Sequence, residues 1–282
     1  MKPYLRWAGG KTQIIGDIKS IIEENFSKEN TFYEPFVGGG AVFLSLSTKK
    51  VVINDFNEEL INSYRIIKDD LNGLIELLTL MEDKHKKSPN GDFYYEVRKW
   101  DREPDYLNKR KEVERAARLI YLNKLCFNGL YRVNNKGFFN TPIGRPNLKS
   151  IVDEENLRSV SDYLNKSNIK LVNGDFEKAV KTAKEGDFIY FDPPYDYNEK
   201  GFIQYTVIDK KHYTIERLKS VSDSLVERGC KVLISNNDTE KVKKLFNTKY
   251  YCFKQIEVQR FISSKPTSRK KVDEILILGN LK

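Results

Sequence analysis

The run of residues that most clearly carries chemistry is an acid followed by two prolines and an aromatic, Asp192-Pro193-Pro194-Tyr195. The double proline stiffens the backbone and has no amide hydrogens of its own. An exocyclic amine is a poor nucleophile because its lone pair is delocalised into the ring that carries it. A carboxylate and a carbonyl that accept hydrogen bonds from the two amine hydrogens favour a tetrahedral nitrogen. The lone pair of that nitrogen can then attack a methyl donor. Asp192 and the Pro193 carbonyl fit these roles, and Tyr195 can stack on the base. The alternative is an ordinary strand-ending turn.

A second run, Phe36-Val37-Gly38-Gly39-Gly40, contains glycines that let a backbone approach a nucleotide-like ligand closely. An acid about twenty residues further on can hold a pair of ribose hydroxyls, and Asp55 stands near that spacing. Three glycines alone also form ordinary loops. The run and the acid together predict a pocket for an adenosine-containing cofactor.

A third cluster, Trp7-Ala8-Gly9-Gly10-Lys11-Thr12, is similar to part of a phosphate-binding loop. That loop requires a glycine where this chain has Leu5, and a preceding strand, which the sequence does not predict. We therefore reject a nucleoside triphosphatase.

Short runs of β-branched and aromatic residues predict the strands that position these motifs. They cover residues 31–34, 51–54, 169–172, 187–191 and 231–235. Helical patterns lie between them, for example from Tyr213 to Glu227. The alternation predicts an α/β fold with a parallel sheet and crossover helices. Ligand sites in such sheets lie beyond the carboxyl ends of the strands, where Asp192 falls.

Residues 58–168 interrupt this alternation with a mainly helical pattern. Within it, Asn128-Gly129 and Asn135-Lys136-Gly137 stand between aromatic and β-branched residues, which predicts a hairpin. We therefore expect a helical insertion that carries a β-hairpin, placed between the second and third strands. Residues 1–57 and 169–282 would form the remaining α/β domain.

Positive charge is concentrated in that insertion. The chain has a net charge of +9, from 49 Lys and Arg against 40 Asp and Glu. Ten of the basic residues and only two acids lie between Leu107 and Lys149, and a further basic run is Arg269-Lys270-Lys271. Clustered positive charge is typical of a partner with a phosphate backbone. A solvated helix face is the alternative.

Composition narrows the class of protein. Hydrophobic residues make up 39% of the chain and charged residues 32%, which is typical of a globular protein with a core. The sequence has no apolar stretch of the roughly 18 residues that a membrane span needs, and no apolar signal-peptide core at its start. Its three cysteines are far apart and lack metal-ligand spacing. We expect a cytoplasmic protein with reduced cysteines, no metal site and no membrane partner.

These motifs, in this order, resemble the Dam family of DNA adenine methyltransferases. The resemblance covers nearly the whole chain and is carried by residues 7–11, 34–40, 54–55, 128–132, 139–145, 192–195, 233–236 and 268–274. It implies a Rossmann-like class I methyltransferase sheet of seven strands with an inserted DNA-recognition domain. It also implies methyl transfer from S-adenosylmethionine to the N6 amine of adenine in duplex DNA. Enzymes of this type extrude their target base, at a cost of a few kcal/mol.

The resemblance also implies roles for individual residues. The catalytic loop would be Asp192 to Tyr195, holding the flipped adenine. The residues expected at S-adenosylmethionine are Trp7, Lys11, Phe36, Gly38, Gly40, Asp55, Asp175 and Asp192.

The hairpin is expected to read the target, with the palindrome GATC favoured. Arg132 would bond bidentately to a guanine edge, and Leu130 and Pro142 would touch a thymine methyl. Such contacts discriminate between bases by roughly 1–3 kcal/mol each. Phe127 and Asn128 would lie beside the space that the flipped adenine leaves. For Leu130 and Pro142, ordinary packing of the hairpin is the alternative.

At the other end of the site Arg6 would reach the outer guanine. One departure from the family follows Tyr195, where residues 196–202 lack the proline- and serine-containing stretch of many relatives. Phe202 and Tyr205 would offer replacement stacking surface there.

Three other functions share some of these sequence features. Basic charge alone does not separate DNA from RNA, so an RNA adenine methyltransferase is one alternative. Protein amide methyltransferases typically have Asn where this chain has Asp192, and they lack a basic hairpin. A non-catalytic DNA-binding protein with a decayed domain is the third, but both ligand loops are intact. The sequence does not decide whether a cognate restriction endonuclease, acting separately, accompanies the enzyme.

Overall fold

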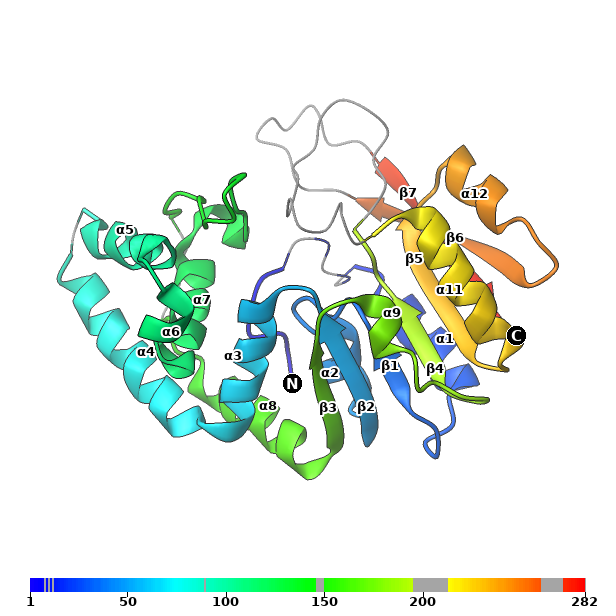
Figure 1. Ribbon diagram of the computed structural model, residues 1–282, viewed down its shortest axis with the longest axis horizontal. Coiled ribbons are helices and arrows are strands. Elements are labelled where there is room, and N and C mark those ends of the chain that lie inside the picture. The colour runs from blue at the N-terminus through cyan, green and yellow to red at the C-terminus, as the bar shows by residue number, and fades with distance from the viewer. Residues whose placement is uncertain are drawn as a thin grey trace.

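A seven-stranded sheet forms the centre of the molecule, in the order β3-β2-β1-β4-β5-β7-β6 (Figure 1). The computed structural model describes residues 1–7, 9, 11, 13–88, 90–145, 150–194, 213–259 and 271–281, with only the backbone of 257–259 and 271–273. The strands are β1 Phe32–Glu34, β2 Lys50–Asp55, β3 Asn168–Asn173, β4 Phe188–Phe191, β5 Lys231–Asn237, β6 Tyr251–Gln259 and β7 Lys271–Gly279.

The five strands predicted from the sequence are all present, and they pair in parallel. The last two strands differ, because β7 runs antiparallel both to β5 and to β6. The residue patterns did not predict β6 and β7, although the family resemblance implied seven strands. The class I methyltransferase sheet expected from that resemblance is confirmed.

Helices cover both faces of the sheet. On one face α1 (Ile15–Asn25), α2 (Ala41–Leu46), α3 (Glu58–Asp69) and α8 (Glu154–Lys166) share a core with strand residues such as Phe32, Phe188 and Tyr190. On the other face α9 (Phe176–Ala179), α11 (Ile215–Glu227) and α12 (Glu240–Phe246) pack on residues such as Ile189 and Phe191. Alternate residues of each strand therefore enter different cores, as the period of two requires. The helix predicted over 213–227 is α11.

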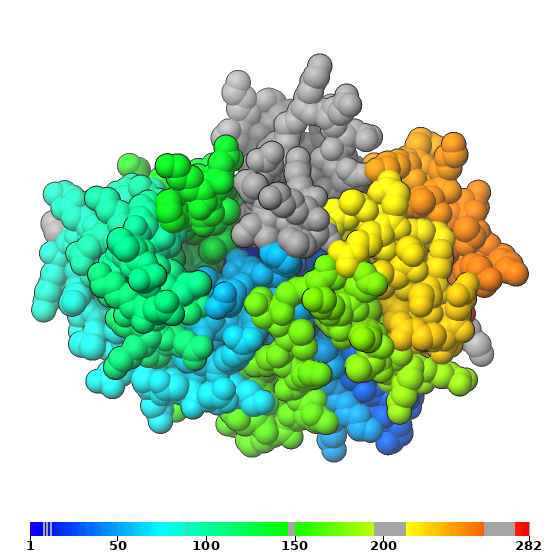
Figure 2. Space-filling view, viewed as in Figure 1, coloured from blue at the N-terminus to red at the C-terminus, as the bar shows by residue number. Residues whose placement is uncertain are grey.

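The remaining helices gather at one end of the molecule, beyond β3 (Figure 1). They are α4 Leu71–Lys86, α5 Asp92–Arg98, α6 Tyr106–Lys109 and α7 Glu112–Leu125, with short 3₁₀ turns at Lys99–Arg102 and Phe127–Gly129. Figure 2 shows this end in cyan and green, and the α11 and α12 end in yellow and orange, on opposite sides of one face. Their apolar residues join the α3 and α8 core. The division of the chain at residues 58 and 168 stays a prediction.

The predicted hairpin has its turn where the sequence placed it. Gly137 has a φ of 81° and its N–H donates to the Asn134 carbonyl at 2.9 Å. The two limbs meet through isolated antiparallel bridges, Val133 to Phe139 and Cys126 to Ile143, and the segment forms no continuous strands. Asn128 explains part of this irregularity, because its φ of 56° bends the first limb out of an extended conformation.

Four acids share one face of the sheet near its carboxyl edge. Glu34, Asp55 and Asp192 end or directly follow β1, β2 and β4, while Glu274 lies near the start of antiparallel β7. Glu274 pairs with Asn237, the last residue of β5, so it reaches the same edge. By the period of two, all four fall on the face that α1 and α2 cover.

Candidate active site

Asp192 forms a buried ion pair at the end of β4. Its Oδ1 lies 2.8 Å from Nζ of Lys11, whose side chain is 4% exposed. The Lys11 ammonium also donates to the Gly9 carbonyl at 3.1 Å and lies 3.9 Å from Oε2 of Glu274. Burial raises the pKa of Asp192 to about 6; Lys11 opposes this and Glu274 adds to it. The site therefore combines a carboxylate acceptor with a nearby fixed positive charge.

Of the rest of the predicted catalytic loop, Pro193 is buried and Pro194 is exposed. Tyr195 lies outside the described residues, as do Phe202 and Tyr205. The Asp192 carboxylate and the Pro193 carbonyl are adjacent along a stiffened backbone. Both are oxygen acceptors, so the described part of the loop has the groups needed to accept two amine hydrogens.

Asp55 is held at the end of β2 by backbone amides. The Gly38 N–H donates to Oδ2 at 3.1 Å, the Asn57 N–H donates to Oδ1 at 2.9 Å, and the Phe56 backbone adds a further hydrogen bond. Burial raises the pKa of this carboxyl to about 6, and the amide hydrogen bonds counter that rise. A carboxylate has about four lone-pair sites, so about one remains for a ribose hydroxyl.

The glycine run lies directly under Trp7. Gly38 and Gly40 have φ values of 49° and 76°, in the left-handed region. A Cβ on Gly38 would meet Cδ1 of Trp7 at 2.7 Å, so only glycine allows this close approach. Trp7, Gly38 and Asp55, three of the residues predicted at the cofactor, therefore form one contiguous group.

Asp175 and Phe36, which were also predicted at the cofactor, contact other side chains of the protein. Asp175 caps α9, accepting from the Glu177 N–H at 3.0 Å, and Arg217 bonds both of its oxygens at 2.7 and 2.8 Å. Phe36 stacks on Phe176 with ring centroids 5.2 Å apart. Asp175 thus orients α9 and Arg217 whether or not it also meets a ligand.

The six residues predicted to contact DNA lie on the hairpin and the N-terminal segment beside it. The Asn123 amide joins these two segments, because it donates to the carbonyls of Arg6 and Gly129 at 2.8 and 3.1 Å. A Cβ on Gly129 would lie 2.6 Å from Cβ of Arg6, which shows how closely they pack. Asn128 is exposed, and Leu130 is half-buried.

The exposed aromatic of this group is Phe127, at 53% exposure. Its N–H donates to the carbonyl of exposed Pro142 at 3.0 Å, which places these two residues side by side. Arg132 donates from Nε to Oδ1 of Asn140 at 2.8 Å. That bond is made by Nε, so it does not engage the two terminal nitrogens of the guanidinium.

Comparison with known proteins shows the family to which the chain belongs. The sequence profile of the D12 class N6 adenine-specific DNA methyltransferases matches residues 7–263. The chain belongs to this family. It is an adenine-specific DNA methyltransferase, and the family uses S-adenosylmethionine as methyl donor.

Similar proteins match over almost their whole length. The Type II methyltransferase M1.LlaDCHI of Lactococcus lactis is 42% identical over 98% of this chain and 95% of its own. The Type II methyltransferase M.MjaIII of Methanocaldococcus jannaschii is 40% identical over 99% of each chain. The DNA adenine methylase of Escherichia coli K12 is 30% identical over 98% of this chain and 95% of its own.

The methyltransferase site fits its cofactor on the chemistry of its acceptor. The Asp55 carboxylate is oriented by backbone amides and keeps about one acceptor site for a ribose hydroxyl, next to the glycine on which Trp7 packs. In the described part of the chain no group of His, Cys, Asp or Glu side chains could hold a metal ion. No helix among the same residues is long and apolar enough to cross a membrane.

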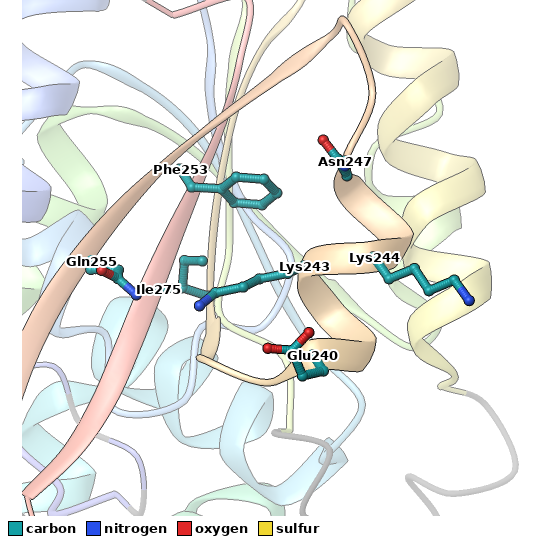
Figure 3. Close-up of a pocket in the computed structure, with 7 residues that line it drawn as sticks. All are labelled: Glu240, Lys243, Lys244, Asn247, Phe253, Gln255 and Ile275. Atoms are coloured by element: carbon teal, nitrogen blue, oxygen red, sulfur yellow. The ribbon is translucent and has the colours of Figure 1, made fainter.

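A hollow elsewhere on the methyltransferase is separate from this site. It lies between α12 and strands β6 and β7 (Figure 3), lined by Glu240, Lys243, Lys244, Asn247, Phe253, Gln255 and Ile275. Ile275 follows Glu274 and points to the opposite face of the sheet. The hollow therefore opens away from the Lys11 and Asp192 pair.

Three residues of the site were given no role from the sequence. Glu34 accepts the Phe43 N–H at 2.9 Å, and burial raises the pKa of this carboxyl well above its usual range, with Asp192 adding to the rise. Glu274 reaches Lys11 from β7. Tyr131 stacks on Trp7, with ring centroids 5.2 Å apart. All three belong to motifs that carried the family resemblance, which was the only sequence signal for them.

Proposed function

We propose that this enzyme methylates the adenine N6 of GATC sites in duplex DNA, and that it flips the target base out of the helix to do so. The observation that carries the proposal is the exposed pair Phe127 and Pro142, joined by a backbone hydrogen bond on the hairpin that also bears half-buried Arg132. This hairpin is linked through Asn123 and Tyr131 to the segment that bears Trp7 and Lys11. Target reading and chemistry are thus built on adjoining parts of the chain.

In this proposal the catalytic loop acts on the amine. Asp192 and the Pro193 carbonyl accept hydrogen bonds from the two N6 hydrogens, and Tyr195 stacks on the flipped adenine. S-adenosylmethionine, when bound, supplies the electrophilic methyl group. Lys11, 2.8 Å from Asp192, holds that carboxylate in its charged form and in place.

The cofactor is held by residues around the glycine run. Asp55 accepts from a ribose hydroxyl, Trp7 covers the pocket and Gly38 and Gly40 allow close approach. Phe36 forms the aromatic wall that continues into α9, and Asp175 faces the adenine end. Support comes from the close packing of Trp7 on Gly38 and from the amides that orient Asp55 beside them.

Recognition of the DNA target sequence is assigned to the hairpin. Arg132, oriented by Asn140, bonds a guanine edge, while Leu130 and Pro142 contact a thymine methyl. Phe127 and Asn128 occupy the space left by the flipped base. At the outer guanine Arg6 completes the site.

Two points on biological setting belong to the same proposal. The similarity to proteins named Type II methyltransferases supports a cognate restriction endonuclease that acts separately. The three cysteines are unpaired, which is typical of a reducing compartment, and supports a cytoplasmic location.

The test is transfer of labelled methyl from S-adenosylmethionine to two duplexes that differ only in one base of GATC. We expect label on adenine of the GATC duplex alone, and loss of label with Asp192→Ala. A 2-aminopurine placed at the target position should brighten on binding, because a flipped base is unstacked. Equal label on both duplexes contradicts the hairpin assignment. Label on an RNA of the same sequence and not on DNA contradicts the substrate.

A control separates specificity from catalysis. Arg132→Ala should methylate GATC and single-mismatch duplexes with more equal kcat/KM, because one guanine contact is worth roughly 1–3 kcal/mol. Arg102→Ala is a poor control because the Arg102 guanidinium donates to the Phe139 carbonyl of the hairpin. Exposed Arg158 on α8 is suitable, since it contacts Glu154 and Asn72, which lie outside the hairpin. Arg158→Ala should leave the discrimination unchanged.

A further inference from the structure

Tyr131 stands between the two halves of the site. It lies in sequence between Leu130 and Arg132, which are assigned to base reading. Its ring stacks on Trp7 with centroids 5.2 Å apart and planes 22° apart, and it also meets Phe139 of the opposite limb at 5.5 Å. The side chain thus belongs to the hairpin by sequence and to the cofactor pocket by contact.

Two neighbours of Tyr131 lead to Asp55. Trp7 packs on Gly38, whose N–H donates to Oδ2 of Asp55. The Asn57 side chain lies near enough to lower the pKa of the Tyr131 phenol, and the Asn57 N–H donates to Oδ1 of Asp55. Two of the amides that hold this carboxylate are therefore linked to a single hairpin side chain, one through Trp7 and one through Asn57.

This contact is tight enough to transmit a displacement. A Cβ at Gly38 would come within 2.7 Å of Trp7, so the indole packs directly on the Gly38 backbone as well as on the Tyr131 ring. Burial raises the pKa of the Tyr131 phenol to about 12, so the side chain stays neutral near pH 7. A shift of the hairpin on DNA would therefore act on Trp7 through this stacked contact.

We propose that Tyr131 is a positioning residue that couples target recognition to cofactor binding, through Trp7 and Gly38 on one side and Asn57 on the other. The inference rests on the proposed roles of the hairpin and of Asp55. Coupling between two binding sites is reciprocal, so cognate DNA tightens cofactor binding by the same factor as cofactor tightens DNA binding. Typical factors are about 5- to 150-fold.

The experiment measures that factor directly. The Kd of a fluorescent duplex carrying the methylated site is determined with and without saturating S-adenosylhomocysteine, which allows no turnover. For the wild type we expect the cofactor product to tighten binding by at least about fivefold. With Tyr131→Ala the factor should fall to about one. Tyr131→Phe keeps the ring and should keep most of the coupling.

A matched control lies on the same hairpin. Phe138 is half-buried and lies 5.4 Å beneath the Arg102 guanidinium, on the limb away from Trp7. Phe138→Ala removes a hairpin aromatic of the same kind, so its DNA affinity can drop, but its coupling factor should match the wild type. Circular dichroism establishes that each variant is folded.

The possible results separate the inference from the proposed function. An unchanged factor in folded Tyr131→Ala overturns the inference, as does a wild-type factor of one or an equal loss in Phe138→Ala. If the wild type methylates a duplex other than GATC, the assigned target is wrong and the coupling is measured on that duplex. If it methylates no duplex, the proposed function fails on its own.

Discussion

At the scale of single residues, the site places four acids at one edge of the sheet, and Lys11 contacts two of them. Lys11 pairs with Asp192 and lies near Glu274, while Glu34 and Asp55 accept hydrogen bonds from backbone amides. Negative charges held together in a poorly solvated place raise one another's pKa. Burial raises the pKa of Asp192 to about 6, and the Glu274 charge adds to that rise. Burial raises the pKa of Asp55 to about 6 as well, and its amide hydrogen bonds counter the rise. The protonation state of Asp192 therefore depends on Lys11 and Glu274.

This arrangement predicts a pH dependence for the chemical step. Asp192 must be ionised to accept amine hydrogens, and its pKa is raised, so kcat should rise from pH 5 and level off above about 6 to 7. Glu274 is one cause of the raised pKa. Glu274→Gln removes its charge and should therefore move this rise in kcat to lower pH.

The measurement is kcat against pH under saturating cofactor and DNA, where the bound complex is observed. The titration of Asp55 should then appear in the KM for the cofactor and not in kcat. Glu24→Gln, on the exposed side of α1, is the control and should leave the profile in place. A profile that moves to higher pH in Glu274→Gln contradicts the assigned repulsion.

At the scale of elements, sequence patterns predicted five strands because each is a short run of β-branched and aromatic residues between loops. They also placed Asp192, Asp55 and the glycine run at carboxyl ends of parallel strands. Strand β6 gave no such signal, since Lys254, Gln255 and Glu257 interrupt its apolar residues. Glu274 could not be placed from pattern, because only the antiparallel direction of β7 carries the start of that strand to the active edge.

In the hairpin, the sequence pattern predicted the turn but not the side chains that hold the hairpin in place. Asp101, 38 residues from Phe139 in sequence, accepts the Phe139 N–H at 2.7 Å and pairs with Arg118 at 2.8 Å. Tyr94 donates to the Thr141 carbonyl at 2.9 Å. Contacts between buried polar groups this far apart in sequence leave no local periodicity, so only the structure reveals them.

We predict that Asp101→Asn loosens the hairpin and leaves the cofactor site intact. Removing one partner of a buried ion pair costs about 3 to 5 kcal/mol, and the lower figure applies because Arg118 keeps its bonds to the Val97 and Arg98 carbonyls. DNA affinity and thermal stability should both fall, while S-adenosylhomocysteine binding without DNA should stay near wild type.

Denaturant unfolding and calorimetric titration with the cofactor product provide the two readouts. Glu103→Gln is the matched control, since the Glu103 and Arg110 pair is about a quarter exposed and should be worth under about 1 kcal/mol. Equal destabilisation by the two substitutions would refute the special position of Asp101. A large loss of cofactor binding in Asp101→Asn would show that the helical end also supports the pocket.

At the scale of the whole molecule, the basic insertion presents less free charge than its composition suggests. Arg115 pairs with Glu58 and Glu59, Arg118 with Asp101, and Arg110 with Glu103. Such cations hold helices together and release few counterions when DNA binds. Lys136 differs because it is exposed at the turn of the hairpin. Net charge therefore overstates the number of phosphate contacts.

This distinction predicts how salt acts on DNA binding. The slope of log Kd against log salt reports the phosphates neutralised, at about 0.9 for each contact on duplex DNA. Lys136→Gln should reduce the slope by about 0.9, while Arg110→Gln should leave it unchanged, because that guanidinium pairs with Glu103 at 2.6 Å and stacks on Trp100 at 4.2 Å. Both substitutions remove one positive charge, so a purely long-range field would make them equivalent. Equal slopes would therefore place the DNA backbone away from the hairpin turn, and a drop confined to Arg110→Gln would place it along α6 and α7.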